Sequence, residues 1–250
     1  MNRIRGYKYW ISVLIPWMFV TSAFTQQARV FPSDSGTGFL EWVNDQYGSD
    51  DLLVSGSIYI PTNPLIDRHP FFDQEDWFGS TLFIGERRFT DQEIGYNLAT
   101  DKMILNAVFT EGATVKIMLN SWKIDSLYLD DHFFINSKYL NLDEKDTTFY
   151  ELIHRNGFTF ISHYRKEYVQ KYAPSTPYGL WSRQLSHHYI FTDQWYPVFS
   201  KKSLLTFFPS GKEEIRRFMR KNHIQYRKAT SRQIRQLVSF CGPFYQSAVK

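Results

Sequence analysis

The chain has 250 residues, of which 43% are hydrophobic, 22% charged and 18% aromatic, and its formal net charge is +4. This composition excludes a disordered chain, which is poor in apolar residues and carries a high net charge. It also excludes a polytopic membrane protein, because long apolar runs do not recur along the sequence. We therefore expect a globular protein with one large domain or two small ones.

The first residues have the order of a secretory signal peptide. Three basic residues, the last of them Lys8, precede an apolar run from Trp10 to Val20, and small residues follow. The run is too short to cross a bilayer core of about 30 Å as a helix, and Pro16 interrupts it, so a permanent anchor is the weaker alternative. We predict a signal peptide over residues 1–25 and an exported protein, either periplasmic or associated with the outer membrane.

A single cysteine, Cys241, excludes an intramolecular disulfide, so the fold must depend on its core. Cys241 shares helical spacing with Ile234, Leu237 and Val238. This pattern favours a small apolar residue on a buried helix face over a nucleophile or an intermolecular bridge.

Formal charge is divided unevenly along the sequence. Residues 26–150 hold nine Lys and Arg against 20 Asp and Glu, whereas residues 151–250 hold 17 against five. Such a division indicates either two lobes with different partners or two halves that attract each other within one fold. We favour the second interpretation, although each surface charge pair contributes little stability.

The predicted elements begin after a leader segment, residues 26–51, that is rich in Ser, Gly and Asp. Short apolar and aromatic runs broken by turn residues then follow, a pattern typical of an antiparallel meander. The expected strands cover residues 52–60, 80–84, 93–98, 102–109, 113–119, 126–129 and 132–136. The expected turns are Ala99–Asp101, Glu111–Gly112 and Asp130–Asp131.

The sharpest local signal is the pair Asn156 and Gly157, which lies between two alternating runs, 149–155 and 158–164. Asn-Gly favours a type I′ hairpin because both residues tolerate a positive φ. A loop rich in Pro and Gly is expected at 171–180. Two more strands, 186–191 and 195–200, complete the β region.

The last 40 residues carry helix-start signals. Ser210 and Thr230 each lie three residues before a Glu or Gln, which is the spacing of a capping box. We predict one helix over Lys212–Lys221 and a second that ends at Gly242. Both helices carry a basic side, formed by Arg216, Arg217, Arg220, Arg232 and Arg235.

Several stretches resemble a group of uncharacterised exported bacterial proteins: Gly56-Ser-Ile-Tyr-Ile-Pro61, Pro70-Phe-Phe, Trp77-Phe-Gly79 and Tyr96-Asn-Leu-Ala-Thr-Asp101. In that group a signal peptide precedes a G-x-x-Y box, a W-x-x-G turn, here one residue shorter, and a strand reading Y-[ND]-x-x-x-D. The similarity extends over most of the chain after the signal peptide. The resemblance implies export and a β-rich body, and it implies no activity and no catalytic residues.

The common signatures of enzyme chemistry are absent, including G-x-S-x-G, the P-loop, H-E-x-x-H and C-x-x-C. We therefore predict no catalytic residue, cofactor or metal. A hydrolase of envelope polysaccharide remains the alternative, because carboxylate enzymes need only two acids that meet in space. A lipid carrier, a third hypothesis, would require an apolar cavity within the sheet.

Four histidines lie on the expected strands between residues 149 and 191. His187 and His188 are adjacent and face opposite sides of a strand, so one of them could meet His154 or His163 of the hairpin at a metal site. We expect structural histidines instead, because these are commoner than the ligands of an isolated site. Asp130-Asp131-His132 is interpreted as a turn.

Aromatic residues near acids could stack and hydrogen-bond a saccharide, although aromatic residues more often fill a β core. The relevant segment holds Phe71, Phe72, Trp77 and Phe78 beside Asp73, Glu75 and Asp76. From it we take Phe72 and Trp77, together with the basic side of the helices, as the candidate binding surface. Its expected partners are an envelope protein complex, a glycan or an anionic membrane surface, and export makes nucleic acid improbable.

These observations predict a mainly β (α+β) protein, with a curved antiparallel meander or partly open barrel over residues 52–200. Two helices in residues 201–250 are expected to pack on it. The expected role is non-catalytic, as an exported cell-envelope protein that binds or scaffolds a partner.

Overall fold

A computed structural model describes residues 51–61, 65–75, 77–108, 114–142 and 147–245, which belong to a compact unit that runs from Val43 to Lys250. The predicted signal peptide, the leader up to residue 50 and the expected turn at Glu111–Gly112 lie outside the described residues. None of the described helices has the length and apolar character needed to cross a bilayer.

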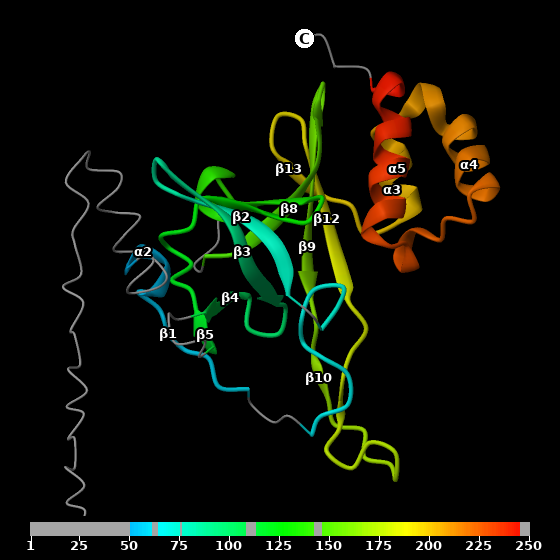
Figure 1. Ribbon diagram of the computed structural model, residues 1–250. Helices are drawn as coiled ribbons and strands as arrows, with labels where there is room; N and C mark the ends of the chain where they lie inside the picture. The colour runs from blue at the N-terminus through cyan, green and yellow to red at the C-terminus, as the bar shows by residue number, and fades with distance from the viewer. Residues whose placement is uncertain (1–50, 62–64, 76, 109–113, 143–146, 246–250) are drawn as a thin grey trace, which may run out of the picture. The chain divides into compact units, whose positions relative to one another are not determined.

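Eleven of the described strands form one antiparallel sheet, in the order β1-β5-β4-β3-β2-β6-β7-β8-β9-β12-β13 (Figure 1). Their bounds are β1 (Ser57–Ile58), β2 (Phe78–Ile84), β3 (Arg87–Asn97), β4 (Lys102–Val108), β5 (Thr114–Met118), β6 (Ser126–Leu129), β7 (His132–Asn136), β8 (Phe149–Asn156), β9 (Phe158–Arg165), β12 (Leu185–Phe191) and β13 (Trp195–Pro197). The sheet does not close into a barrel. The predicted mainly β fold, with an antiparallel sheet and two C-terminal helices, is confirmed.

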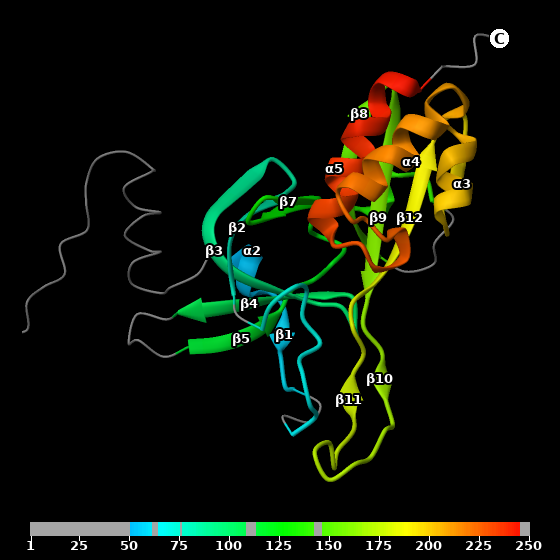
Figure 2. The same cartoon turned by 90° about the vertical axis from the view of Figure 1, so that its right-hand side faces the viewer.

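The sheet bends along its length. In Figure 2, β4 and β5 run across the direction of β9 and β12. Two further strands, β10 (Tyr168–Val169) and β11 (Leu180–Trp181), pair with each other in a separate hairpin. This hairpin follows β9 and precedes β12, so it extends from the ends of these two strands (Figure 2).

One expected strand is wrong as a single element. Residues 52–60 form a helical turn, α2 (Asp51–Val54), followed by the two-residue strand β1. Leu52 and Leu53 are neighbours in sequence, yet both pack against the same hydrophobic cluster. A strand would turn them to opposite faces, whereas neighbouring residues of a helical turn can face the same side.

The predicted hairpin at Asn156 and Gly157 is confirmed, but its turn is not type I′. Gly157 has a φ of +78°, whereas Asn156 is not among the residues with a positive φ. The pairing of β8 with β9 shifts by one residue between Leu152 and His154, which is a β-bulge. The shift centres the turn on Gly157, so only this residue needs the left-handed region.

Three described helices follow the strands: α3 (Lys201–Thr206), α4 (Lys212–Lys221) and α5 (Ser231–Cys241). The capping box at Thr230 is confirmed, because Thr230 and Gln233 each accept the other's backbone N–H. The box expected at Ser210 is wrong, since Ser210 donates to the Phe244 carbonyl and α4 has no side-chain cap. Helix α3 was not predicted. Short 3-10 helices cover Ser137–Tyr139, Pro209–Gly211, Tyr226–Lys228 and Gly242–Phe244.

The core consists of two hydrophobic clusters that share strands β8 and β9. The first includes Phe72, Tyr96 and Phe134, and it lies within the part of the sheet that β1 to β9 form. The second includes Phe160 and Leu237 and lies between the sheet and the helices. In Figure 2, α4 and α5 cover β8, β9 and β12.

We predict that Phe72→Ala lowers the free energy of unfolding by about 3–5 kcal/mol, because it leaves a cavity in the first cluster. Phe72 is 0% exposed, and four aromatic rings have centroids between 5.2 and 6.5 Å from its own. Urea unfolding measures the change. The matched control is Phe199→Ala, which removes a ring that is 66% exposed and should cost about 0.5 kcal/mol or less. Equal losses in the two variants would contradict the assignment.

Candidate functional site

A buried polar cluster, which we call the Glu151 network, lies where the two hydrophobic clusters meet. Alternate residues of a strand share one face, and on β8 these are Phe149, Glu151 and Ile153. Phe149 belongs to the first cluster and Ile153 to the second. Glu151 lies between them and is 0% exposed, so its carboxylate must find all its partners within the protein.

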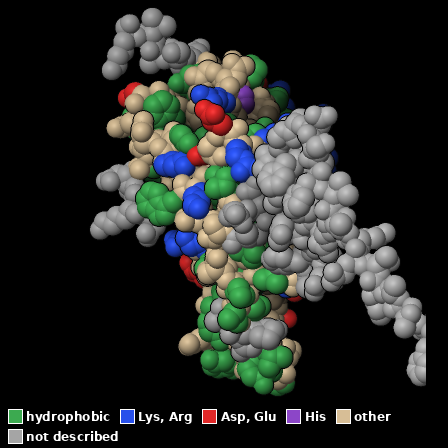
Figure 3. All heavy atoms as spheres, turned by 60° about the vertical axis from the view of Figure 1, so that its left-hand side comes forward, with side chains coloured by type: hydrophobic (Ala, Val, Ile, Leu, Met, Phe, Trp, Pro, Cys, Tyr) green, Lys and Arg blue, Asp and Glu red, His purple; other side chains and the backbone are tan. Residues whose placement is uncertain are grey.

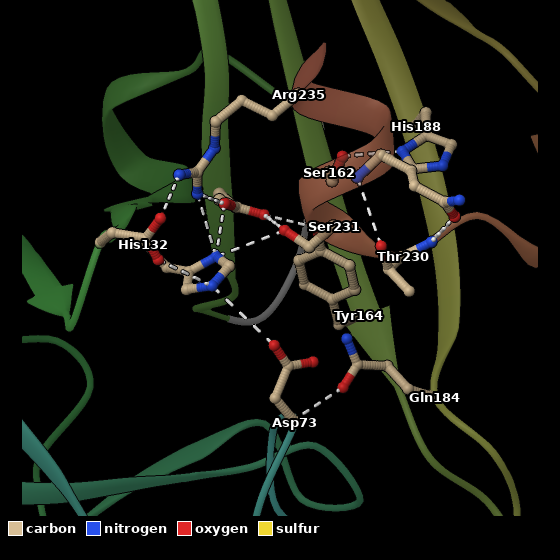
Figure 4. A network of polar contacts seen from close by, with 12 residues as sticks. Asp73, His132, Ser162, Tyr164, Gln184, His188, Thr230, Ser231 and Arg235 are labelled. Carbon is tan, nitrogen blue, oxygen red and sulfur yellow. Dashed lines mark hydrogen bonds and ion pairs between the residues drawn. The ribbon is translucent and has the colours of Figure 1, made fainter. Parts of the chain in front are cut away.

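Four donors converge on this carboxylate, from His132, Tyr164, Ser231 and Arg235, whose side chains are labelled in Figure 4. Its Oε1 atom lies 2.7 Å from both His132 Nδ1 and Arg235 Nη2. Its Oε2 atom accepts from the Ser231 hydroxyl at 2.9 Å and from the Tyr164 hydroxyl. An ionised carboxylate offers about four acceptor sites, so the hydrogen-bonding capacity of Glu151 is filled.

Two cations of the network bridge Glu151 to a second carboxylate, Asp131. The Arg235 guanidinium donates from Nη1 to Asp131 at 2.7 Å, and His132 Nε2 lies 3.2 Å from the other Asp131 oxygen. Arg235 Nη2 and His132 Nδ1 lie 3.1 Å apart, because both point at the same oxygen of Glu151. Opposite charges therefore alternate from the buried Glu151 to the exposed Asp131.

These contacts shift the pKa values of both partners. Burial opposes the protonated form of His132, but its hydrogen bond to Glu151 and the charges of Glu151 and Asp131 outweigh burial and raise its pKa. Burial likewise opposes the ionised form of Glu151, but its contacts with His132, Tyr164 and Arg235 outweigh burial and lower its pKa. Both shifts favour the charged forms of the two partners.

Ser231, His132 and Glu151 are the residue types of a hydrolytic triad, but their geometry differs from one. In a triad the serine and the carboxylate contact different nitrogens of the imidazole. Here Ser231 Oγ lies 3.3 Å from Nδ1, the nitrogen that also faces Glu151. Ser231 is buried and donates directly to the Glu151 carboxylate. The serine is thus a structural donor at the first turn of α5, where the helix dipole also favours the anion.

Further polar pairs extend the network across the sheet (Figure 4). Asp73 has a carboxylate oxygen 3.8 Å from His132 Nε2, and its backbone N–H donates to the Gln184 side chain at 3.1 Å. Ser162 and His188 share a 2.7 Å hydrogen bond. Burial lowers the pKa of His188 to about 4, so this histidine is neutral at physiological pH.

The arrangement can hold elements together, because its members come from β7, β8, β9 and α5. Arg235 and Ser231 fix α5 to the sheet, and His132 fixes β7 to β8. The four donors around Glu151 are all bonded to its carboxylate. We therefore assign the Glu151 network a positioning role for the C-terminal helices.

The predicted basic side does not hold together as one surface. Arg235 points into the Glu151 network, where its guanidinium pairs with Glu151 and Asp131. Arg216 pairs with Glu213 one turn earlier on α4. Arg217, Arg220 and Arg232 are exposed, and these three remain available to a partner.

The predicted aromatic surface is also divided. Phe72 is 0% exposed, so its place on a binding surface is wrong, because burial in the first cluster takes up its whole ring. Trp77 is partly exposed and lines a cavity of about 260 Å³ with Phe71, Glu75 and Trp181, which we call the aromatic cavity. The Trp77 ring is engaged by the protein itself. Phe71 contacts it edge-on, and the Lys116 ammonium lies 5.3 Å from its centroid.

A larger cavity, of about 610 Å³, lies beside β9 and β12 and is called here the histidine cavity. His163 and His187 are direct cross-strand partners, as the sequence suggested for one histidine from each strand, and both line it. The other lining residues are Leu98, Ala99, Thr100, Asp101, Lys102, Trp122, Thr147, Thr148, Arg165 and Tyr189. His163 and Asp101 approach to 3.5 Å. Among the described residues, no group of three His, Cys, Asp or Glu is placed to hold a metal ion.

No protein-family model, curated protein or solved structure matches this chain. The resemblance to exported bacterial proteins therefore stays a prediction, and the function has to follow from the geometry of the sites.

No pattern in the sequence predicted the Glu151 network. Asp131 and His132 were interpreted as part of a turn, and Asp130 does take the left-handed conformation of a turn, with a φ of +52°. Glu151 and Tyr164 lie in alternating strands and carry no motif. The one available signal was Glu151 itself, an acid at an inward position of an otherwise apolar strand face.

We predict that Arg235→Ala lowers the free energy of unfolding by about 3–5 kcal/mol, because it leaves the buried Glu151 carboxylate without one of its cations. Arg235→Lys should cost less, because it keeps the charge but cannot bridge Asp131 and Glu151 with two nitrogens. Arg217→Ala, which removes an exposed arginine of α4, should change stability by about 0.5 kcal/mol or less. Similar losses for Arg217→Ala and Arg235→Ala in urea unfolding would contradict the assigned role.

The network also predicts a pH dependence of stability. The pKa of His132 is raised, so its contribution is complete below the ordinary value of 6.5 and is lost as the pH rises through the raised value. The pKa of Glu151 is lowered, so its contribution is complete above the ordinary value of 4.5 and is lost as the pH falls through the lowered value. Urea unfolding at several pH values should give a maximum between these limits. In His132→Gln the decline on the alkaline side should be smaller than in the wild type, and an unchanged decline would assign it to another group.

Proposed function

We propose that this protein is exported to the bacterial cell envelope and has a non-catalytic role there, binding or scaffolding an envelope protein complex or a glycan. A scaffold needs an exposed apolar or charged patch, and an enzyme needs a pocket with convergent reactive groups. The feature that supports the proposal best is an exposed apolar surface on the β10–β11 hairpin.

We define the hairpin surface as Leu65, Tyr168, Val169, Tyr172 and Tyr178. These side chains are between 38% and 64% exposed. Asp67 forms a bridge to Leu180, which places the segment that carries Leu65 beside the hairpin. In Figure 3, hydrophobic side chains gather at the lower end, the level at which Figures 1 and 2 place this hairpin.

Exposed apolar side chains on so small an element indicate that the hairpin binds a partner. A two-stranded hairpin alone is marginally stable in water, and here β10 pairs only with β11 among the described strands. The outer side of β10 is a strand edge, which a partner chain can extend by adding a strand. This feature favours a protein as the partner of the hairpin surface.

The carboxylates of the Glu151 network favour binding over hydrolysis. Glu151 is filled by four donors, and Asp131 is paired with Arg235. A glycosidase needs one acid to protonate a leaving group and a second to act as base or nucleophile on an accessible sugar. Glu151 and Asp131 instead bind the residues that hold α5 on the sheet, so neither carboxylate is free to act on a sugar.

Co-sedimentation with washed envelope membranes of the native host tests the proposal. The purified protein should sediment with the envelope, and the double variant Val169→Ser, Tyr172→Ser should reduce the bound fraction at least fivefold at 0.15 M salt, because it removes apolar contact from the hairpin. Fractionation of cells that express the full chain tests export in the same strain.

Phe199→Ser is the matched control, because Phe199 is 66% exposed and lies outside the hairpin. This variant should bind like the wild type. Arg217→Gln with Arg220→Gln should reduce only the part of the binding that salt disrupts. Envelope binding that survives the hairpin double variant would refute the assigned surface, and a chain retained in the cytoplasm would refute export.

A further inference from the structure

The histidine cavity takes no part in the Glu151 network or the hairpin surface, and its lining has an unusual property. The buried side-chain nitrogen and oxygen atoms that lack a hydrogen-bond partner in the described part of the chain are Thr147 Oγ1 and His163 Nε2. Both residues line this cavity. Asp101 Oδ2 lies 3.5 Å from His163 Nε2, a distance that is long for a hydrogen bond.

Unsatisfied atoms of this kind are rare, since most buried polar side-chain atoms in native proteins are bonded. Thr147 is only 8% exposed, so the protein shields its side chain from most of the open solvent. Two such atoms beside one cavity of about 610 Å³ indicate that hydroxyl or carbonyl groups of a ligand supply the missing bonds.

The charged residues of the lining favour an anionic ligand. Lys102 and Arg165 carry fixed positive charges against the single fixed negative charge of Asp101, whose carboxylate already accepts from the Tyr96 hydroxyl. Arg165 is exposed and has no ion-pair partner among the described residues. A guanidinium in this state is suited to bind a carboxylate through two hydrogen bonds.

An aromatic platform stands at the same cavity. Trp122 lines it and is 67% exposed, whereas Trp77 in the aromatic cavity is held by protein contacts. An exposed indole face presents apolar surface against which the C–H face of a sugar ring can pack. Threonine hydroxyls from Thr100 and Thr148 add polar groups around it.

We propose that the histidine cavity binds an acidic saccharide, a sugar that carries a carboxylate. Arg165 and Lys102 receive the carboxylate, and Trp122 packs against the ring. Thr147 and His163 hydrogen-bond the sugar hydroxyls. The site is separate from the hairpin surface, so the double variant Val169→Ser, Tyr172→Ser should bind saccharide like the wild type.

Titration calorimetry and saturation-transfer NMR with the purified protein test the proposal. The probes are glucuronic, galacturonic and N-acetylmuramic acid, with glucose and inorganic phosphate for comparison. At least one acid should bind with a Kd of 1 mM or tighter, and glucose and phosphate should each bind at least tenfold more weakly. Arg165→Gln should abolish the preference for the acid over glucose.

Thr147→Val is the sharpest variant, because it keeps the shape of the side chain and removes only the hydroxyl. Since that hydroxyl has no partner in the protein, the variant should unfold at the same urea concentration as the wild type or a higher one. Its affinity for the acid should fall at least fivefold. Thr159→Val, a matched change on β9 outside this cavity, should leave affinity unchanged.

Three results would overturn the proposal. The first is no binding of any acid at 10 mM. The second is inorganic phosphate binding as tightly as the best acid, which would indicate a simple anion site. The third is wild-type affinity, or a loss of stability, in Thr147→Val, because either would show that the hydroxyl does not serve a ligand.

Discussion

The carboxylate of Glu151 is the constraint on which much of this structure depends. A fully buried anion is tolerated only where its hydrogen bonds are complete and opposite charge is near. Here these requirements are met by His132 from β7, Tyr164 from β9, and Ser231 and Arg235 from α5. Each of these elements must therefore be in place before burial of Glu151 becomes favourable, which couples the C-terminal helices to the sheet.

The uneven division of charge along the chain has a structural counterpart at this point. Arg235 of the basic half pairs with Asp131 of the acidic half, at a separation of 104 residues. This contact agrees with the interpretation that the two halves attract each other within one fold. The attraction is specific rather than general, since Arg217, Arg220 and Arg232 stay exposed on the same helices.

Most of the fold could be predicted from the sequence because its signals are local. Alternation predicted the strands, and the capping residues of α5 lie next to the helix that they cap. Helix α3 was missed because its capping box uses Ser200 and Ser203 instead of the usual Glu or Gln. The Glu151 network could not be predicted, because Ser231 and Glu151 are 80 residues apart and no spacing rule connects them. Phe72 and Trp77 differ for the same reason, since only tertiary packing decides which ring is buried.

Histidines, acids and hydroxyls occur in both polar regions of this protein, and the difference between the regions is in their bonding. Around Glu151 every acceptor site of the carboxylate is filled, and the energetic cost of burial is offset within the chain. Around the histidine cavity, Thr147 Oγ1 and His163 Nε2 lack a hydrogen-bond partner among the described residues, and Arg165 has no ion pair there. A completed network stabilises a fold and leaves nothing for a ligand to add. Buried polar groups that lack hydrogen-bond partners lower the stability of the protein. A ligand that supplies the missing partners gains binding free energy from these hydrogen bonds.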